Sequence, residues 1–419
     1  MIRLQISALL ALLLTACGQQ SAPEPEAAPE AGPNYVGVTI VATVPEGTGE
    51  VFIATNHNDW TPNGAPMTPN PSAEDERVAQ ILLEEGYALE YKFTLGTWEQ
   101  EATNEDGFPY PNFQLTAMEG TLVTHEIAGF ERPRAEILAD PEGSGAIGTL
   151  IHWPDVASEF LEPTRTVSIW LPPAYDAPEN ADRRYPVIYM TDGQNLFDPR
   201  LSNYGVDWGV DEAMVRGMER GAFEPAIIVS HFSTVNRGQE YSPWHDAPLL
   251  ARMVIEELKP RIDQEFRTLT GPENTFTMGS SMGGLHSMFL VLNYPEVFSA
   301  CGCVSSHLPF SEAVVARYSG LETPEEPDEV PYFQRDIEQG RFTPPAGARM
   351  FFDWGTATLD AGYPEPHAYL RNHLLSLGLV EGEDVLFREY PGAPHNEEAW
   401  RERVEDQLVW LLAKDVPAE

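Results

Sequence analysis

Residues 275–287 read TFTMGSSMGGLHS, where a run of strand-forming residues passes through a glycine-rich turn into a helical pattern. The turn at residues 279–283 has the form G-x-S-x-G, with Ser281 and not Ser280 at its centre. At a strand-to-helix turn this pattern holds the central hydroxyl in a strained position above the edge of a sheet. The glycines could equally serve a tight turn alone. Whether Ser281 is a nucleophile depends on whether other residues of the chain supply a base and an acid for it.

The chain from residue 149 onward alternates strand-like apolar runs with amphipathic stretches, which predicts an α/β unit over residues 149–419. The apolar runs are TVSIWLP, YPVIYM, AIIVSHF, TFTMG, ACGCVSS, RMFFDWG and VLFREYP. In the first long amphipathic stretch, PLLARMVIEELKPRIDQEFR, Leu250, Val254 and Leu258 share one helix face. Runs that are apolar throughout indicate strands buried on both faces, so a mostly parallel sheet between helices is expected.

A serine hydroxyl needs a base to become nucleophilic, and the base needs an acid to orient it. In a fold of this kind the three residues follow in the order Ser, then Asp or Glu, then His. His395 lies in the loop GAPHNEEAW between the last strand and the last helix and is the candidate base. Asp360 lies past the end of RMFFDWG, where ligand-facing residues collect, and is the candidate acid. Asp353, inside that strand, and Glu365 are the alternatives.

The oxyanion of a tetrahedral intermediate needs backbone N–H donors. Met282 directly follows the candidate nucleophile, so its amide is the first expected donor. The second is expected from the loop TDGQNLFDP after YPVIYM, at Gly193 and Gln194. Asp192 is expected to hold this loop through local hydrogen bonds.

His307 follows a strand-like run and is expected to line the pocket of this site. The segment NRGQEYSPW is expected to border the pocket as well, through Arg237, Glu240, Tyr241 and Trp244. The sequence has no HExxH motif and no set of Cys and His with ligand spacing, so no metal site is expected. Cys301 and Cys303 are two residues apart on one strand, which suits buried thiols better than a disulfide.

Residues 35–130 read differently, as short strands separated by turn formers, which predicts a small immunoglobulin-like β-sandwich. The stretches VFIATNHNDWTPNGAPM, LEYKFTLGTWEQEA and FPYPNFQL resemble starch- and glycogen-binding sandwich modules in their order. The resemblance implies that Trp60 and Trp98 stack on sugar rings, since flat aromatic faces suit pyranoses. Glycan binding and an inert spacer remain equal alternatives for this unit. A linker at residues 131–148 separates it from the α/β unit.

The first 17 residues combine an arginine, the apolar run ISALLALLL and the ending LTAC, which is typical of a signal peptide. The ending resembles the lipobox of bacterial lipoproteins, which implies lipidation of Cys17. With Gly18 next, the resemblance implies a lipoprotein of the outer membrane of a Gram-negative bacterium, anchored in the membrane by this lipid. Residues 18–34, rich in Pro, Ala and Glu, are expected to be a disordered tether.

Acidic residues outnumber basic ones, 65 to 25, for a formal net charge of −40. A field of this sign disfavours nucleic acid and anionic membrane surfaces as partners. It also disfavours a strongly anionic substrate. The hydrophobic fraction of 42% is ample for a packed core, which excludes global disorder.

With these residues assembled, residues 149–415 resemble the putative-esterase family of α/β-hydrolases, which includes enterochelin, feruloyl and acetylxylan esterases and S-formylglutathione hydrolase. The matching stretches are TVSIWLPPAYD, YPVIYMTDGQNLFD, NRGQEYSP, GSSMGG, FFDWGTATLDAGY and PHNEEAWRERV. The resemblance implies an α/β-hydrolase fold and ester hydrolysis through an acyl-serine intermediate, without metal or organic cofactor. It supports Ser281, Asp360 and His395 as the triad, although some members use a Ser–His pair alone.

The substrate class expected from the anchor and the sandwich is an ester group on a polysaccharide, or a related small ester. The competing hypothesis is an envelope-anchored glycan-binding protein whose hydrolase unit is inert. Against it stands the presence of all three candidate side chains in the expected chain order.

Overall fold

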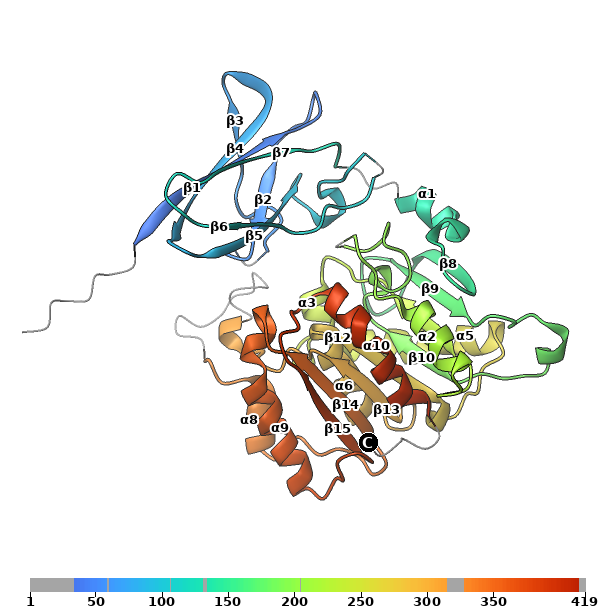
Figure 1. Cartoon of the computed structure of the whole chain (residues 1–419). Coiled ribbons are helices and arrows are strands. Elements are labelled where there is room, and N and C mark those ends of the chain that lie inside the picture. Colours follow the sequence, from blue (N-terminus) through green and yellow to red (C-terminus); the bar gives the residue numbers. More distant parts are fainter. Residues whose placement is uncertain are drawn as a thin grey trace, which may run out of the picture.

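The computed structural model describes residues 34–58, 60–105, 107–130, 134–203, 205–314 and 328–413. Within them the chain forms a small all-β unit followed by a larger α/β unit, which lie against each other (Figure 1). The predicted signal peptide with Cys17, and the tether up to residue 33, lie outside the described residues.

The β unit is a sandwich of two sheets with the strand orders β3-β4-β1-β7 and β2-β5-β6. Its strands are β1 (Tyr35–Thr43), β2 (Phe52–Thr55), β3 (Thr68–Asn70), β4 (Ala73–Glu84), β5 (Ala88–Thr94), β6 (Phe113–Thr116) and β7 (Leu122–Glu126). Alternate residues of β1 are buried, because a strand with one face on the core has a period of two. Val38 and Ile40 of β1 share the core with Ile53 and Phe93 of the other sheet. The predicted sandwich is therefore confirmed.

The α/β unit is built, among the described residues, on an eight-stranded sheet with the order β15-β14-β13-β12-β10-β11-β9-β8. Its strands are β8 (Thr149–Val156), β9 (Arg165–Leu171), β10 (Val187–Met190), β11 (Ile227–His231), β12 (Thr275–Ser280), β13 (Ala300–Val304), β14 (Arg349–Gly355) and β15 (Val385–Tyr390). Strands β10 to β15 run parallel, and β9 runs antiparallel between β8 and β11. The mostly parallel sheet is confirmed, and β8 is a strand that the apolar runs did not reveal.

Helices cover both faces of this sheet (Figure 1). One face carries α2 (Val210–Glu219) and α10 (Glu397–Leu412). The other carries α4 (Ala247–Arg252), which continues through a π-helical segment (Met253–Leu258) into α5 (Lys259–Glu265), together with α6 (Met282–Asn293) and α9 (Pro364–Ser376). Leu250, Val254 and Leu258 are buried on one face, as their spacing predicts. The short helix α3 (Arg237–Glu240) lies over the carboxyl end of β10, where Arg237 binds Asp192. The short helix α8 (Tyr332–Glu338) lies beside α9.

The segment between the two units contains α1 (Arg134–Ala139) and a 3₁₀ turn (Pro141–Ser144), where the sequence indicated a linker. Cys301 and Cys303 on β13 are buried free thiols, as expected from their spacing. Among the described residues no helix combines the length and the apolar character that crossing a bilayer requires.

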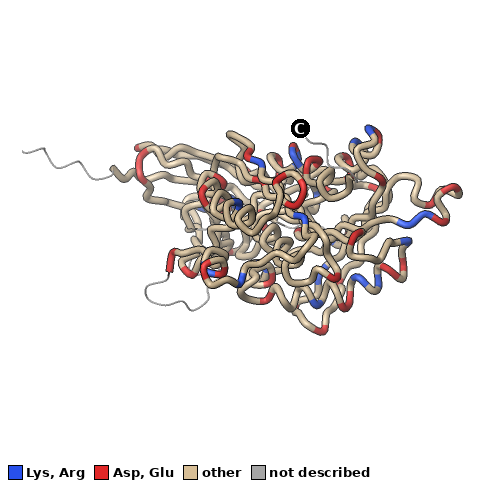
Figure 2. The backbone as a smooth tube through the Cα atoms, turned by 90° about the horizontal axis from the view of Figure 1, so that it is seen from below, with Lys and Arg blue, Asp and Glu red and all other residues tan. Residues whose placement is uncertain are grey.

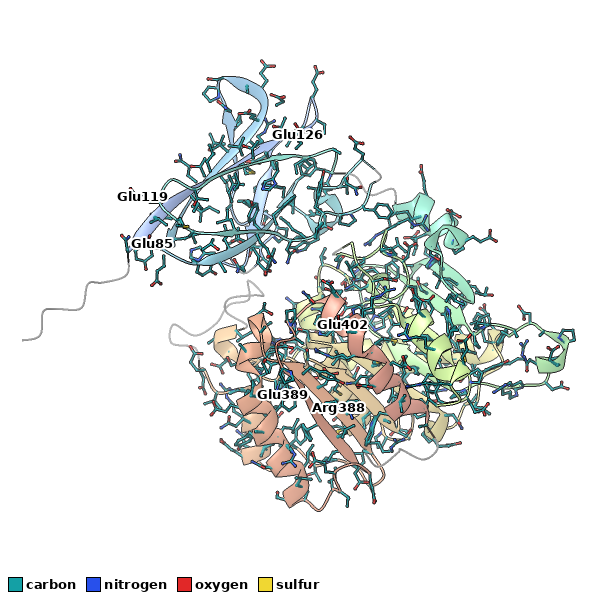
Figure 3. All side chains as sticks on the ribbon, in the orientation of Figure 1. Glu85, Glu119, Glu126, Arg388, Glu389 and Glu402 are labelled. Carbon is teal, nitrogen blue, oxygen red and sulfur yellow. The ribbon has the colours of Figure 1, made fainter. Side chains whose placement is uncertain are left out.

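Asp and Glu residues are distributed along the whole backbone tube instead of gathering in one region (Figure 2). Glu85, Glu119 and Glu126 stand exposed on the sandwich, and Glu389 and Glu402 on the α/β unit (Figure 3). The formal net charge of −40 therefore acts as a distributed negative field around the molecule.

Candidate active site

Ser281 occupies the turn between β12 and α6 with φ 56° and ψ −120°. A positive φ is sparsely populated for a residue with a side chain and marks local strain. The turn is held on both sides, because the Ser281 amide donates to the Val304 carbonyl at 2.9 Å and its carbonyl accepts from the His307 amide at 3.1 Å. The predicted strand–turn–helix context of G-x-S-x-G is therefore present.

The two glycines of the motif are required by close packing against the loop after β10. A Cβ on Gly279 would lie 2.2 Å from Thr191 Oγ1 and 2.8 Å from the backbone of Gly283. A Cβ on Gly283 would also lie 2.2 Å from Thr191 Oγ1. All three distances are shorter than a real Cβ contact, so a side chain at either position would clash. The glycines thus allow the turn at Ser281 to approach the loop in which oxyanion donors were expected.

His395 and Asp360 form a direct pair, with His395 Nδ1 2.5 Å from Asp360 Oδ1. The other oxygen of Asp360 accepts from the Gly355 amide at 2.7 Å and from Ser305 Oγ at 2.6 Å. Burial by itself raises the pKa of Asp360, but the hydrogen bonds from His395, Ser305 and Gly355 outweigh burial, so the pKa lies below its ordinary value. A charged Asp360 holds the proton of His395 on Nδ1 and leaves Nε2 as the acceptor.

The loops that carry these two residues are tied to each other. The His395 amide donates to Thr358 Oγ1 at 2.8 Å. The Ala393 carbonyl accepts from the amides of Thr356 and Ala357, each at 3.1 Å. Both loops follow neighbouring parallel strands, β14 and β15, so the pair sits at the carboxyl edge of the sheet.

Asp353, the first alternative for the acid, lies inside β14 and is fully buried. Its oxygens accept from the Ser305 amide at 3.1 Å and from Gln407 Nε2 at 2.6 Å, and Arg403 lies 3.2 Å away. Burial raises its pKa against the opposing effect of Arg403. Asp353 therefore joins β14 to α10. Glu365, the second alternative, is exposed on the first turn of α9.

Ser305 is a site residue that the sequence analysis missed. Its hydroxyl donates to Asp360 and accepts from Trp400 Nε1 at 3.1 Å and Arg403 Nη2 at 2.6 Å. It adopts φ 38° directly after β13. Its place at the carboxyl end of a parallel strand was the signal that could have identified it.

The reactive atoms of Ser281 and His395 are both available. Neither Ser281 Oγ nor His395 Nε2 makes a hydrogen bond to any of the described residues. Ser281 is partly exposed, and the His395 side chain is 12% exposed. The hydrogen bonds of a catalytic site often tighten only when substrate is bound, so these free atoms are compatible with a working pair.

His307 lies between the turn at Ser281 and the candidate base. Its amide binds the Ser281 carbonyl, and its Nδ1 lies 2.7 Å from the hydroxyl of Tyr363. The Tyr363 ring lies 5.6 Å from the ring of His395. Burial, with smaller effects of His395 and Arg237, lowers the pKa of His307 to about 3, so it is neutral in the working range.

Gly193 and Gln194 lie in a 3₁₀ turn (Gly193–Asn195) directly after β10. Their amides donate to no acceptor among the described residues, and neither does the amide of Met282 at the start of α6. The Gln194 side chain is fixed by Ser233, accepting from its amide at 3.1 Å and donating to its hydroxyl at 2.8 Å. The amides expected to bind the oxyanion therefore have no other acceptor among the described residues.

The side chain of Asp192 was expected to make local hydrogen bonds within this turn. It is bound instead by residues more than 40 positions further along the chain. Asp192 adopts φ 54° and accepts two hydrogen bonds of 2.8 Å from Arg237. The Tyr241 hydroxyl lies 3.1 Å from its amide and 3.3 Å from Oδ1. Arg237 and Tyr241 therefore brace the turn, and Tyr241 is fully buried and cannot line a pocket.

Glu240 is also no pocket residue, because it forms a buried pair with Arg165 at 3.0 and 3.2 Å. Trp244 is partly exposed, and its ring lies 4.9 Å from Tyr332 and 6.0 Å from Phe310. Phe310 lies 6.1 Å from His307. Trp244 therefore belongs to an aromatic wall that continues from His307, as a bordering residue would.

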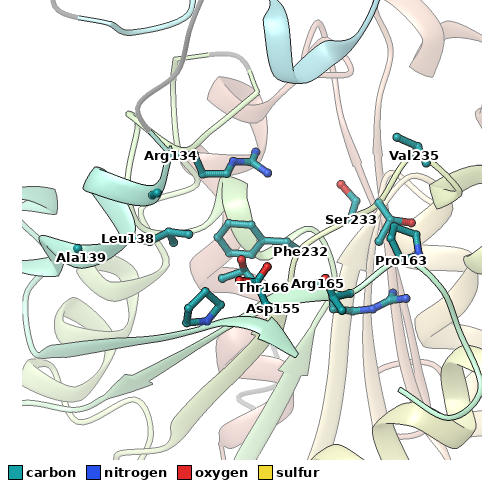
Figure 4. A pocket seen from close by; sticks show the side chains of 14 residues that line it. Arg134, Leu138, Ala139, Asp155, Pro163, Arg165, Thr166, Phe232, Ser233 and Val235 are labelled. Carbon is teal, nitrogen blue, oxygen red and sulfur yellow. The ribbon is translucent and has the colours of Figure 1, made fainter. Parts of the chain in front are cut away.

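A cavity of about 590 Å³ lies between α1 and the segment that follows β11 (Figure 4). Arg134 and Leu138 of α1 form one side, and Phe232 and Ser233 after β11 form another. The triad candidates do not line this cavity. It adjoins the site through Ser233, the partner of Gln194.

Trp60 and Trp98 both lie on loops of the sandwich and are partly exposed. Trp60 adopts φ 55° in the loop after β2, and Trp98 begins the 3₁₀ turn after β5. Among the described residues no ring contact joins them. Both side chains are therefore partly accessible on the surface of the sandwich.

One acidic cluster, Asp207, Asp211 and Glu212, has carboxylate oxygens within 4.8 Å of one another. Arg401 pairs with both Asp207 and Glu212, at 2.9 Å in the second case. The Arg401 guanidinium therefore already neutralises part of the negative charge that would attract a metal cation. The cluster serves the packing of α2 against α10.

Comparison with known proteins places the α/β unit in a family. A family model described as "Putative esterase" matches residues 158–411, more than half of the chain. "Uncharacterized protein YbbA" of Bacillus subtilis (strain 168) is 25% identical over 169 residues, which cover 37% of this chain and 62% of the relative. The "Endo-1,4-beta-xylanase/feruloyl esterase" of Xylanibacter ruminicola is 27% identical over 163 residues, which cover 38% of this chain and 22% of the relative.

The match spans less than two thirds of the length of these curated relatives. Among solved structures, the enterobactin esterase FES of Shigella flexneri aligns with a TM-score of 0.48 and 17% identity, covering 90% of this chain and 93% of that chain. The extent of the family match decides the classification: the chain belongs to the putative esterase family.

Proposed function

We propose that the protein is a carboxylic ester hydrolase that works through an acyl-serine intermediate. Ser281 is the nucleophile, His395 the general base and acid, and Asp360 the residue that orients His395. The observation that carries this proposal is the 2.5 Å pair of Asp360 and His395 at the sheet edge where Ser281 occupies its strained turn. The esterase family supports the same reaction class.

In the first step Ser281 Oγ attacks the ester carbonyl carbon, and His395 Nε2 takes the hydroxyl proton. The carbonyl oxygen becomes an oxyanion that accepts hydrogen bonds from the amides of Met282 and of Gly193 or Gln194. Collapse expels the alkoxide, which leaves as alcohol with the proton from His395. Water then attacks the acyl-serine with the same base, and collapse returns Ser281 and the free acid.

For the substrate we propose ester groups on polysaccharides or related small aryl and alkyl esters. A relative named as a xylanase and feruloyl esterase supports this class. The sandwich and the accessible Trp60 and Trp98 add a surface on which sugar rings could stack. The net charge of −40 disfavours a strongly anionic ester.

We also propose that Cys17 carries a lipid that anchors the protein in the outer membrane. The support is the sequence pattern alone: a short apolar run that ends in LTAC, followed by a tether rich in Pro and Glu. A mass measurement of the N-terminal peptide from a bacterial membrane fraction tests this proposal. An unmodified cysteine at that position would contradict it.

The catalytic proposal is tested with p-nitrophenyl acetate, butyrate and a long-chain ester, and with methyl ferulate. Ser281→Ala is expected to lose about four to six orders of magnitude in kcat. Ser280→Ala, which changes the buried neighbouring serine, is the matched control and is expected to keep activity. No turnover by the wild type, together with binding of α-glucans or hemicellulose, would favour the inert glycan-binding protein instead.

A further inference from the structure

The sandwich meets the α/β unit at one buried lysine. Lys92 of β5 has a side chain only 3% exposed. Its ammonium lies 3.3 Å from Glu101 Oε2, 2.7 Å from the Tyr110 carbonyl and 3.1 Å from the Asn203 carbonyl. An ammonium has three protons to donate, and within the described part of the chain Asn203 is the acceptor that the α/β unit supplies to it. Losing that acceptor would leave a buried donor unmatched, which is costly.

A second close contact fixes the same loop against the sandwich. Gly205, with φ +69°, follows Asn203 by two residues. A Cβ there would lie 2.7 Å from the Pro109 carbonyl, so only glycine permits this approach. The loop between the turn at Gly193–Asn195 and α2 is therefore held from the sandwich at two points.

From Asn203 the hydrogen bonds continue into the candidate active site. The Asn203 amide donates to Asn195 Oδ1 at 3.0 Å. Asn195 is the last residue of the turn that offers the amides of Gly193 and Gln194. Its own amide donates to the Asp192 carbonyl at 2.9 Å. The Asn195 side chain thus joins the loop held by the sandwich to the turn with the oxyanion donors.

The other end of the Asn195 side chain reaches the loop of the base. Asn195 Nδ2 donates to Glu397 Oε1 at 3.3 Å. Glu397 is the first residue of α10, two residues after His395, and is 3% exposed. Burial raises the pKa of Glu397 to about 8, so a neutral carboxyl can accept this bond without a buried charge. The Asn195 amide serves both bonds, because its oxygen accepts from Asn203 and its nitrogen donates to Glu397.

We propose that Lys92 is a positioning residue for the hydrolytic reaction, which makes the sandwich a structural part of the catalytic centre. Through Asn203 and Asn195 it holds the turn with the oxyanion amides. Through Glu397 it holds the loop that carries His395. This inference rests on the proposed ester hydrolysis. A misplacement of reacting groups by about 1 Å can cost about 100-fold in rate, so a change at a distance is expected to be visible in kcat.

The test compares Lys92→Met combined with Glu101→Gln against Val38→Ala. The double variant removes the ammonium without leaving a buried carboxylate unpaired, so the sandwich can still fold. Val38 lies in the sandwich core on β1, in the sheet that does not carry Lys92, so Val38→Ala is chosen to weaken the sandwich core without removing the ammonium. The double variant is expected to lower kcat about 5- to 20-fold with KM changed less than about twofold. Val38→Ala is expected to keep kcat at a comparable loss of Tm.

Amide hydrogen exchange gives a readout that needs no turnover. Faster exchange is expected at residues 193–196 and 396–400 in the double variant and not in Val38→Ala. Unchanged kcat in the double variant, or an equal loss of kcat in Val38→Ala, would overturn the inference. If the wild type hydrolyses no ester, the proposed function fails, but the exchange measurement still tests the structural coupling. Equal exchange rates at residues 193–196 and 396–400 in the double variant and in Val38→Ala would overturn that coupling.

Discussion

Ser305 donates a hydrogen bond of 2.6 Å from its hydroxyl to Oδ2 of Asp360, the carboxylate oxygen that does not face His395. Because this bond favours the charged carboxylate and fixes its plane, Ser305→Ala is expected to lower kcat about tenfold with little change in KM. Ser306→Ala is the control, because the hydroxyl of this adjacent serine makes no hydrogen bond to Asp360 among the described residues. Steady-state kinetics with p-nitrophenyl butyrate measure both, and equal kinetics for the two variants would contradict this role.

Asp360 and Asp353 are distinguished by replacing each with asparagine. Asp360→Asn removes the acceptor that keeps the His395 proton on Nδ1, so kcat is expected to fall by about two to four orders of magnitude. Asp353→Asn disturbs a buried carboxylate between Arg403 and Gln407, so it is expected to lower Tm much more than kcat per folded molecule. Kinetics normalised by active-site titration, with thermal unfolding, separate the two. A catalytic loss confined to Asp353→Asn would reverse the assignment.

The close packing of the G-x-S-x-G turn predicts that a second substitution, at Thr191, restores stability lost through Gly283→Ala. Gly283→Ala places a Cβ against Thr191 Oγ1, and a loss of about 2 kcal/mol or more in unfolding free energy is expected. Adding Thr191→Ala removes that oxygen and is expected to restore part of the loss. Gly279→Ala also meets the backbone of Gly283, so Thr191→Ala is expected to help it much less. Chemical denaturation of the single and double variants measures this, and equal rescue of both glycine variants would contradict the packing.

The buried carboxyl of Glu397 predicts a pH dependence of stability. Burial raises its pKa from 4.5 to about 8, so its contribution is present below the unfolded value and is lost as pH rises toward 8. Relative to the wild type, Glu397→Gln is therefore expected to gain a few kcal/mol of unfolding free energy between about pH 5 and about pH 9. Urea denaturation at both pH values measures this gain. Glu398→Gln, at the exposed neighbour, is the control, and the same pH trend in both variants would contradict the assignment.

Local patterns were sufficient for the main features of the fold and the site. The apolar runs identified β9 and the parallel strands β10 to β15, because strands buried on both faces are apolar throughout. Chain order and the rule that ligand-facing residues follow strand ends singled out His395 and Asp360, which the structure brings within 2.5 Å. The strand β8 was not predicted, because Pro154 and Asp155 interrupt its pattern of apolar residues. Proline is tolerated there because β8 is an edge strand of the sheet.

What the sequence could not reveal depends on partners far apart in the chain. Glu240 was predicted to border the pocket. It instead forms a buried ion pair with Arg165, which is 75 residues away in the sequence. Asn195 and Glu397 are 202 residues apart, and no periodicity links them. Long-range pairs of polar residues follow from the folded topology, so they appear only when the sheet and its loops are assembled.

Ser281 is proposed to act as a nucleophile that His395 activates. The most direct measurement treats the protein with a serine-directed phosphonate and maps the modified residue by peptide mass spectrometry. A covalent adduct is expected on Ser281, absent in Ser281→Ala, present in Ser280→Ala and formed much more slowly in His395→Ala. An unmodified wild-type protein, or the same adduct in Ser281→Ala, would contradict it.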